Sequence, residues 1–239
     1  MTCLSSLASN ENLLQLYLDD AEKFTINNKM KINPNKTKII KFNKSRKHDF
    51  PPEVYLSNNE LLDVVSEVKL VGVIVSNDLK WQKNTDFICL RARQKLWVLR
   101  RLKKFNMEIS NLADVYKKEI RCLLEYAVPV WHSSLTIKQS NQIERVQKEA
   151  FRIILEHNYI NYEVACTLLV MEPLDIRRVQ LCLKFAKKDL KREQTLFTRD
   201  FKTNHTRSNS KLVKEIRCRT NRYAKSSMPF LSKLLNSQC

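Results

Sequence analysis

Apolar residues recur along most of this chain at intervals of three and four, the spacing that puts them on one face of a helix. The first such segment runs from Asn10, a possible N-cap, to about Asn27. Its apolar positions are Leu14, Tyr17, Leu18, Ala21 and Phe24. Asn33-Pro34-Asn35 then breaks the pattern, so we expect one helix near the amino terminus.

A β-like region follows this helix. Short stretches rich in Val, Ile and Leu occupy residues 38–42, 53–56, 61–65 and 68–75. Turn-forming residues separate them, at Pro51-Pro52 and at Ser57-Asn58-Asn59. These stretches predict a small antiparallel sheet with the first helix packed against it.

From about Lys83 onward the helical spacing is almost continuous. One predicted helix has the inward stripe Cys89, Ala92, Leu96, Leu99 and Leu102. The next, capped by Ser110, has Leu112, Val115, Tyr116, Ile120 and Leu123. A buried bend is expected at Pro129, within the apolar residues 126–131.

Thr136 and Gln139 have the spacing of a capping box and open a third long helix. Its inward positions are Ile143, Val146, Ala150 and Ile153, and Glu144–Lys148 and Arg145–Glu149 are expected on its solvated face. Shorter and longer helices are expected at residues 163–169 and from Pro173 to about Arg192, with a last one at 229–235.

The predicted fold class is α+β and mostly α: a small antiparallel sheet with one packed helix, followed by an all-helical domain. We expect three parts, at residues 1–81, 82–194 and 195–239, the last a basic tail that ends in a short apolar helix. The 239 residues include only one glycine, Gly72, and six prolines. Such a composition favours long helices and few tight turns.

The charge points to a polyanionic partner. Lys and Arg number 43 against 25 Asp and Glu, a formal net charge of +18. Nucleic acid is the usual physical reason for such an excess. The seven cysteines are scattered without metal-ligand spacing, a pattern typical of a reducing compartment. Without a signal-like amino terminus or an apolar run of about 18 residues, we expect an intracellular protein, cytoplasmic or nuclear, with no membrane partner.

Several segments together resemble a known family. Residues 28–38 (NKMKINPNKTK) are similar to the fourth palm motif of jockey-like, long-interspersed-element reverse transcriptases. Residues 68–74 (VKLVGVI) resemble the β-hairpin called the primer grip, and 78–81 (DLKW) follow at the family's distance. The primer-grip motif usually reads aromatic-Lys-Tyr-Leu-Gly, so Val68, Leu70 and Val71 depart from it but stay apolar.

The resemblance continues to the last residue. Residues 124–132 (LEYAVPVWH) and 143–148 (IERVQK) look like the thumb, and 219–223 (RTNRY) followed by 228–230 (MPF) resemble the usual end of these reading frames. From about residue 12 onward the chain is thus similar to the late palm, thumb and connection of a non-LTR retrotransposon reverse transcriptase. Phe24 stands where the family tends to have Trp.

The resemblance implies a fragment of an RNA-directed DNA polymerase without its catalytic aspartates. In the family, two Mg²⁺ ions are held by carboxylates upstream of the region matched here. We therefore expect no catalytic residue, no metal ligand and no cofactor in this chain, which alone would be inactive. Leu18-Asp19-Asp20 could be mistaken for the catalytic pair, but it lies in a helical pattern with Asp20 on the wet face.

A nucleic-acid contact surface is expected within residues 91–104, which contain no acid. In the family a thumb helix follows the minor groove of the template–primer duplex. The contact residues expected on this helix are Arg93, Arg100, Arg101 and Lys104. Lys36 and Gly72 are added by their match to the palm motif and the primer-grip turn. A second basic region, residues 199–225, is either a further contact surface through Arg217, Arg219 and Arg222 or a disordered linker. RNA or an RNA–DNA hybrid is the expected partner.

Two other functions remain open from the sequence. The helical domain could bind a protein partner or itself, since a palm without its fingers would expose apolar surface. Alternatively, the reading frame could be a genomic relic without a selected function. His132, beside Trp131, is interpreted as a structural histidine rather than a catalytic one.

Overall fold

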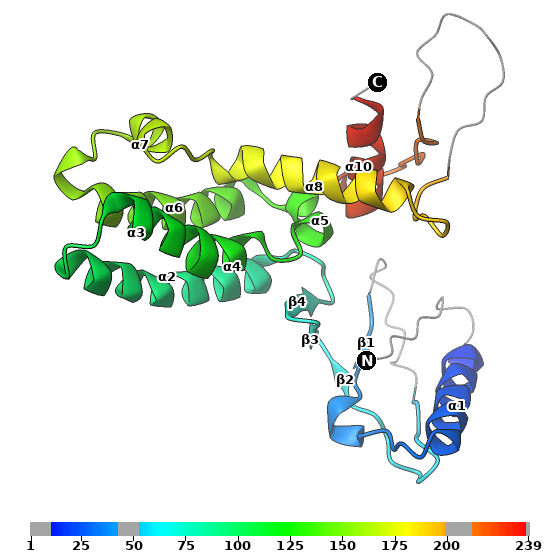
Figure 1. Ribbon diagram of the computed structural model, residues 1–239. Coiled ribbons are helices and arrows are strands. Elements are labelled where there is room, and N and C mark those ends of the chain that lie inside the picture. The colour runs from blue at the N-terminus through cyan, green and yellow to red at the C-terminus, as the bar shows by residue number, and fades with distance from the viewer. Residues whose placement is uncertain (1–10, 43–52, 199–211, 238–239) are drawn as a thin grey trace, which may run out of the picture. The chain divides into compact units, whose positions relative to one another are not determined.

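The computed structural model describes residues 11–42, 53–198 and 212–237. The chain divides into two compact units, Met1–Leu79 and Lys80–Cys239 (Figure 1). The first unit contains the strands and the second is helical. The predicted fold class, α+β and mostly α, is confirmed.

The first unit is built around one helix. Helix α1, Glu11–Asn27, packs through Leu18 on a small core completed by Val54, Leu56 and Leu62. The predicted apolar face was too wide, because Tyr17 and Phe24 are 43% and 63% exposed. A core of four buried residues is too small to cover all five positions. Asn10, the predicted N-cap, lies outside the described residues.

The strands pair differently from the single antiparallel sheet that we predicted. β1, Ile39–Ile40, pairs in parallel with β2, Val64–Val65, while β3, Glu67–Leu70, and β4, Val73–Ser76, form a separate antiparallel hairpin. The long connection between β1 and β2 permits a parallel crossover, and residue composition carries no information on strand direction. A short 3₁₀ turn, Pro34–Lys36, precedes β1.

The hairpin has a two-residue turn with positive φ at both positions, 46° at Val71 and 84° at Gly72. Type I′ turns require this combination, and it suits the twist of the flanking strands. Glycine adopts it without a steric penalty. The β-branched Val71 does not, so this turn is the strained point of the hairpin.

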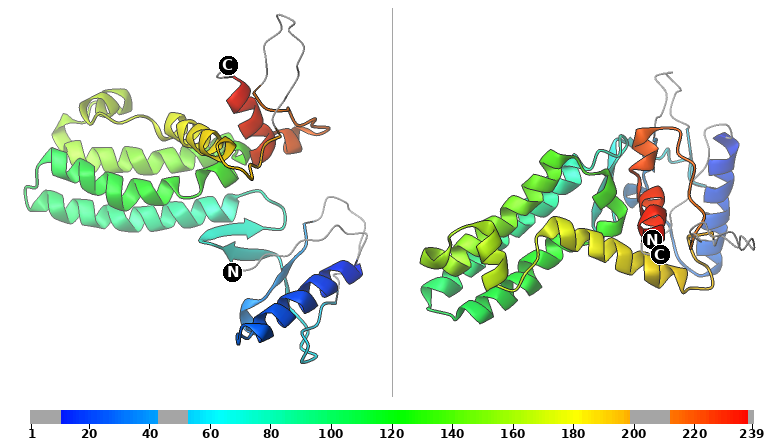
Figure 2. Two further views of the ribbon diagram at one scale, coloured as in Figure 1. Left: turned by 45° about the vertical axis from the view of Figure 1, so that its right-hand side comes forward. Right: turned by 90° about the horizontal axis from the view of Figure 1, so that it is seen from above.

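The second unit begins with a helical layer. Helix α2, Gln82–Lys104, lies along α6, Ile137–Leu155 (Figure 2). α3, Ile109–Val115, continues through a π-helical segment, Tyr116–Arg121, into α4, Cys122–Glu125. All three pack on α2.

The π-helical segment shifts the buried face of this second predicted helix. Leu112, Tyr116, Ile120 and Leu124 are fully buried, so the inward residue of the last turn is Leu124 and not Leu123. A wider turn places residues four apart in register, which a period of 3.6 does not predict. The helix also starts at Ile109, one residue before the predicted cap Ser110.

The remaining predicted helices occur in the expected order, together with short helical elements that the sequence did not predict. α5, Val128–Trp131, forms the bend at Pro129, and η3, His132–Ser134, leads to α6, whose capping box of Thr136 and Gln139 is present. Next come η4, Glu156–Asn158, α7, Tyr162–Leu168, and α8, Leu174–Leu190. α9, Asn221–Ala224, and α10, Ser227–Asn236, complete it, with α10 packed on α8 and α5.

A polar network lies inside this helical unit. Arg178 of α8 is 0% exposed, and its guanidinium donates hydrogen bonds to Ser140 Oγ at 2.6 Å and to His132 Nδ1 at 3.3 Å. Its counter-charge is Glu144, with 4.0 Å between Nη1 and Oε2. The prediction that Glu144 is solvated was therefore wrong. Residues from distant elements, which a helical pattern does not reveal, enclose it.

The stability of the second unit should fall as the pH drops below 6.5. Burial and the charge of Arg178 lower the pKa of His132 to about 4, while Asp175 acts weakly in the other direction. Because the unfolded chain protonates this ring near pH 6.5 and the folded one does not, protons favour the unfolded state. A pKa shift of this size lowers the free energy of unfolding by about 2–3 kcal/mol at pH 4.5, compared with neutral pH.

Thermal unfolding of the chain and of a His132→Gln variant at pH 7 and pH 4.5 measures this effect. Glutamine still accepts a hydrogen bond from Arg178 but does not titrate. The variant should lose less stability between the two pH values than the original chain. Equal losses would show that His132 is accessible to protons in the folded state.

Candidate nucleic-acid interface

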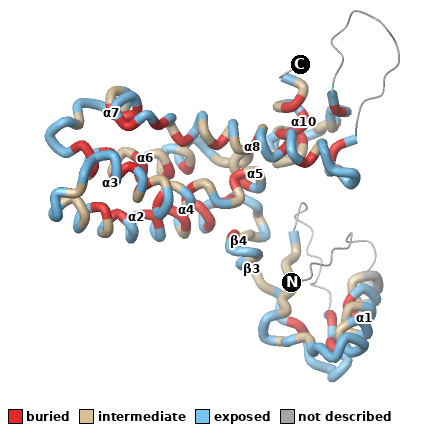
Figure 3. The backbone as a smooth tube through the Cα atoms, in the orientation of Figure 1, coloured by how far each residue is buried: buried red, intermediate tan, exposed pale blue. Residues whose placement is uncertain are grey.

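Helix α2 has one buried and one exposed side. Cys89, Ala92, Leu96 and Leu99 are at most 1% exposed and face the core. Buried and exposed residues accordingly alternate along α2 in Figure 3. The exposed side carries a compact group of residues that we call the α2 face: Arg93, Trp97, Arg100, Arg101 and Lys104.

Some cations of α2 are tied to acids of the same unit. Arg93 Nε lies 3.6 Å from a carboxylate oxygen of Glu149 on α6. Lys95 Nζ is 3.0 Å from Glu119. Lys103 Nζ is 3.8 Å from Glu156 and donates a hydrogen bond to the Ile154 carbonyl at 3.1 Å. The charges of these three residues are thus partly neutralised within the protein.

The remaining charges of the α2 face have no acidic partner among the described residues. Arg100 and Lys104 are exposed and form no ion pair there, and the Arg101 guanidinium lies over the Trp97 ring, 5.2 Å from its centroid. The single acid of α2 is Asp86, which accepts hydrogen bonds from Gln82 and Gln142. Within the described residues, the carboxyl-terminal half of α2 therefore presents to solvent the positive charges of Arg100, Arg101 and Lys104 without an acidic partner.

Trp97 was not among the residues predicted for this site. Its exposed fraction is 59%, against 7% for Trp81 and 0% for Trp131. The sequence contained the information needed to find it. Trp97 lies off the Leu96/Leu99 stripe and is four residues from both Arg93 and Arg101, the spacing of helical neighbours.

Lys36 and Gly72 belong to the first unit, whereas the α2 face belongs to the second. Lys36 ends the 3₁₀ turn and is exposed. Gly72 is the second residue of the hairpin turn and is also exposed. Each is accessible to solvent within its own unit.

The basic residues near the carboxyl terminus form a separate group. Arg217 and Arg219 are exposed in the segment before α9, and Arg222 is exposed on α9. The segment adjoins α10, at the opposite end of the second unit from the carboxyl end of α2 (Figure 1). The structure does not bring these arginines together with the α2 face.

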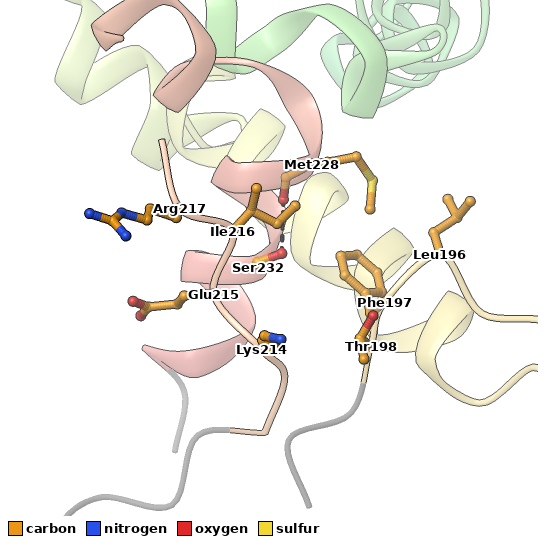
Figure 4. Close-up of a pocket in the computed structure, with 9 residues that line it drawn as sticks. All are labelled: Leu196, Phe197, Thr198, Lys214, Glu215, Ile216, Arg217, Met228 and Ser232. Atoms are coloured by element: carbon orange, nitrogen blue, oxygen red, sulfur yellow. Dashed lines mark hydrogen bonds between the residues drawn. The ribbon is translucent and has the colours of Figure 1, made fainter. Parts of the chain in front are cut away.

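Arg217 also borders a cavity of about 260 Å³ next to α10. In Figure 4, Ile216 and Met228 point toward Phe197, while Arg217 and Glu215 point away from it. The interior of the cavity is thus mostly apolar, and the guanidinium lies outside it. The cavity adds no anion-binding character to this region.

No group of three or more His, Cys, Asp or Glu in residues 11–42, 53–198 and 212–237 is arranged to hold a metal ion. Leu18-Asp19-Asp20 lies within α1, as predicted, with Leu18 buried and Asp20 in an exposed pair with Lys23. Its carboxylates do not converge. Within the described chain, no helix is both long and apolar enough to cross a membrane.

Comparisons with protein-family models, with curated proteins and with solved structures found no match to this chain. The α2 face is the arrangement with the clearest chemistry. It combines an exposed aromatic ring with two cations, Arg100 and Lys104, that have no acidic partner among the described residues. Surfaces that bind single-stranded nucleic acid combine positive charge with aromatic rings.

Proposed function

We propose that the second unit binds RNA or an RNA–DNA hybrid through the α2 face, as a thumb-like part of a non-LTR retrotransposon reverse transcriptase. One observation carries this proposal: Arg100, Arg101 and Lys104 are exposed on one helix with no acidic partner among the described residues. The net charge of +18 supports it. A free cation gains more from a phosphate than one already paired with a carboxylate.

The size of the α2 face suits a short run of nucleotides. From Arg93 to Lys104 the helix rises about 16 Å, at 1.5 Å per residue. One strand of a duplex advances about 3.4 Å per phosphate, so three to five phosphates could lie within reach. Each phosphate neutralised by a side chain releases counterions, which makes binding weaken steeply with salt.

In this proposal the chain holds nucleic acid and does not itself transfer phosphoryl groups. Polymerisation needs metal ions held by several convergent carboxylates. The resemblance assigns those carboxylates to the early palm of the family. The chain would then be one part of an RNA-directed DNA polymerase and inactive alone.

Self-association is a second candidate, favoured by exposed apolar residues. Leu90 on α2 is 59% exposed, and Phe105, the residue that follows the end of α2, is 74% exposed. In the first unit, Phe24 on α1 is likewise a large apolar side chain exposed to solvent. Burying such surfaces in a second copy would give assembly that depends on protein concentration and little on salt.

Replacing two free cations tests the proposal. Arg100→Gln/Lys104→Gln should weaken binding of an RNA–DNA hybrid about tenfold or more at low salt. It should also lower the slope of log affinity against log salt concentration by about 2, one for each lost phosphate contact. The measurement is a fluorescence anisotropy titration at several salt concentrations.

Lys187→Gln/Lys188→Gln is a matched control. Both lysines are exposed in the last turn of α8, so the variant loses the same two charges elsewhere on the same unit. It should bind nearly as the original chain does. Equal losses in the two variants would show a response to net charge and would contradict a site on α2.

A further inference from the structure

Trp97 exposes an unusual amount of apolar surface for its residue type. More than half of the side chain is accessible, although an indole can bury 150–250 Å² when it packs. In the described chain its notable ring contact is with the Arg101 guanidinium, 5.2 Å from the ring centroid. The ring therefore retains accessible surface for a ligand.

The surroundings of Trp97 restrict the chemistry of that ligand. Its helical neighbours three and four residues away are Arg93, Gln94, Arg100 and Arg101. Three of these four are cationic, which disfavours a basic or a purely apolar partner. A matching ligand has a flat apolar group and an anionic group within a few ångströms of each other.

An unpaired nucleotide has this combination. Its base offers a π-face for stacking, and its phosphate offers the charge that Arg100 and Arg101 require. In a blunt duplex the bases stack on one another and mainly the sugar–phosphate backbone faces a bound helix. Within a continuous duplex the indole therefore has no exposed base face on which to stack, whereas every unpaired base offers one.

We propose that Trp97 is a stacking platform for an unpaired base of single-stranded RNA or DNA, with the adjacent phosphates held by Arg100 and Arg101. This inference rests on the proposed nucleic-acid binding and adds a ligand class to it. The α2 face prefers a strand with unpaired nucleotides to a continuous duplex. The preference does not depend on base sequence, since every base has a π-face.

The test compares Trp97→Leu with Trp97→Phe on two ligands of equal length, oligo(dT) and a blunt DNA duplex. Leucine keeps the apolar, helix-forming character but cannot stack, whereas phenylalanine can. Trp97→Leu should weaken oligo(dT) binding about tenfold and duplex binding less than twofold. Trp97→Phe should retain most of the affinity, and oligo(rU) should behave as oligo(dT) does.

Tryptophan fluorescence gives an independent measurement. Trp81 and Trp131 are buried, so quenching by a bound base reports mainly on Trp97. Oligo(dT) should quench the emission of the original chain, and Trp97→Phe should abolish that quenching while binding persists. Binding without quenching would overturn the inference, as would equal losses for the two ligands in Trp97→Leu.

The failure of this inference can be distinguished from the failure of the proposed function. If no ligand binds at low salt, both are wrong. If binding depends on Arg100 and Lys104 but not on Trp97, only the stacking platform is wrong. If Trp97→Leu instead abolishes self-assembly and leaves oligo(dT) binding intact, Trp97 is a protein contact and the inference is overturned.

Discussion

Glu144→Gln is expected to lower the free energy of unfolding of the second unit by about 3–5 kcal/mol. Arg178 is fully buried, and Glu144 supplies more of the negative charge that offsets its own than Asp175 does. Glutamine fills the same space as Glu144 but removes its negative charge. An unbalanced buried charge costs far more than an exposed one, because water no longer solvates it.

The other contacts of Glu144 tie several elements together. Its Oε1 accepts hydrogen bonds from the Tyr162 hydroxyl of α7 and, at 2.9 Å, from the Leu174 amide that begins α8. Burial and the neighbouring Glu144 raise the pKa of Tyr162, so its hydroxyl remains a donor. Gln147 extends the network, since it accepts from Tyr116 and donates to Tyr162. Weakening the hydrogen bonds of Glu144 to Tyr162 and Leu174 should therefore loosen the packing of α7 and α8 on α6.

The measurement is chemical denaturation, with Glu149→Gln as the control. Glu149 lies on the same helix, but its pair with Arg93 is substantially exposed, so its loss should cost less than about 1 kcal/mol. The double variant Glu144→Gln/Arg178→Met should recover part of the stability, because it removes both charges while the glutamine oxygen can still accept hydrogen bonds from Tyr162 and Leu174. A small effect of Glu144→Gln would mean that Arg178 does not depend on this counter-charge.

Trp131→Ala is the second substitution with a large expected effect, about 3–5 kcal/mol. Trp131 is 0% exposed on α5, and its indole N–H donates a hydrogen bond to the Tyr126 carbonyl at 2.9 Å. α5 contacts both α8 and α10. Alanine would leave a cavity at the point where the carboxyl-terminal segment packs on the unit.

The chain provides its own control, because Trp97→Ala makes the same change at an exposed site. That variant should alter stability by less than about 0.5 kcal/mol. In thermal unfolding, Trp131→Ala should lower the midpoint temperature by about 6–20 °C, because each kcal/mol shifts it by about 2–4 °C in a unit of this size. Equal midpoints for the two variants would show that the burial of Trp131 contributes little.

Local features of the fold were predictable from sequence. The capping box of Thr136 and Gln139 was predicted correctly, because its two partners lie three residues apart. The buried face of α2 was also predicted well, because helical spacing is a local property, although Leu102 is only partly buried. Features that depend on distant residues were not predictable. The burial of Glu144 depends on Tyr162, Leu174 and Arg178, which no helical period connects to it.

The candidate site shows the same division. The sequence predicted the cations of α2, because their density is a local property. It could not show which of them are neutralised, since Glu119, Glu149 and Glu156 come from other elements. Arg93, one of the predicted contacts, forms an ion pair with Glu149, whereas Arg100 and Lys104 have no acidic partner among the described residues. The tertiary fold thus reduces the set of predicted α2 cations that have no acidic partner among the described residues.

The most direct test of the central proposal is the affinity of the purified chain for an RNA–DNA template–primer at low and at moderate salt, with nucleotide incorporation followed in the same samples. We expect binding that falls steeply as salt rises, without incorporation above background. Absence of binding at low salt, or binding insensitive to salt, would contradict a nucleic-acid surface on α2. Incorporation would contradict the proposal that the chain only holds its ligand.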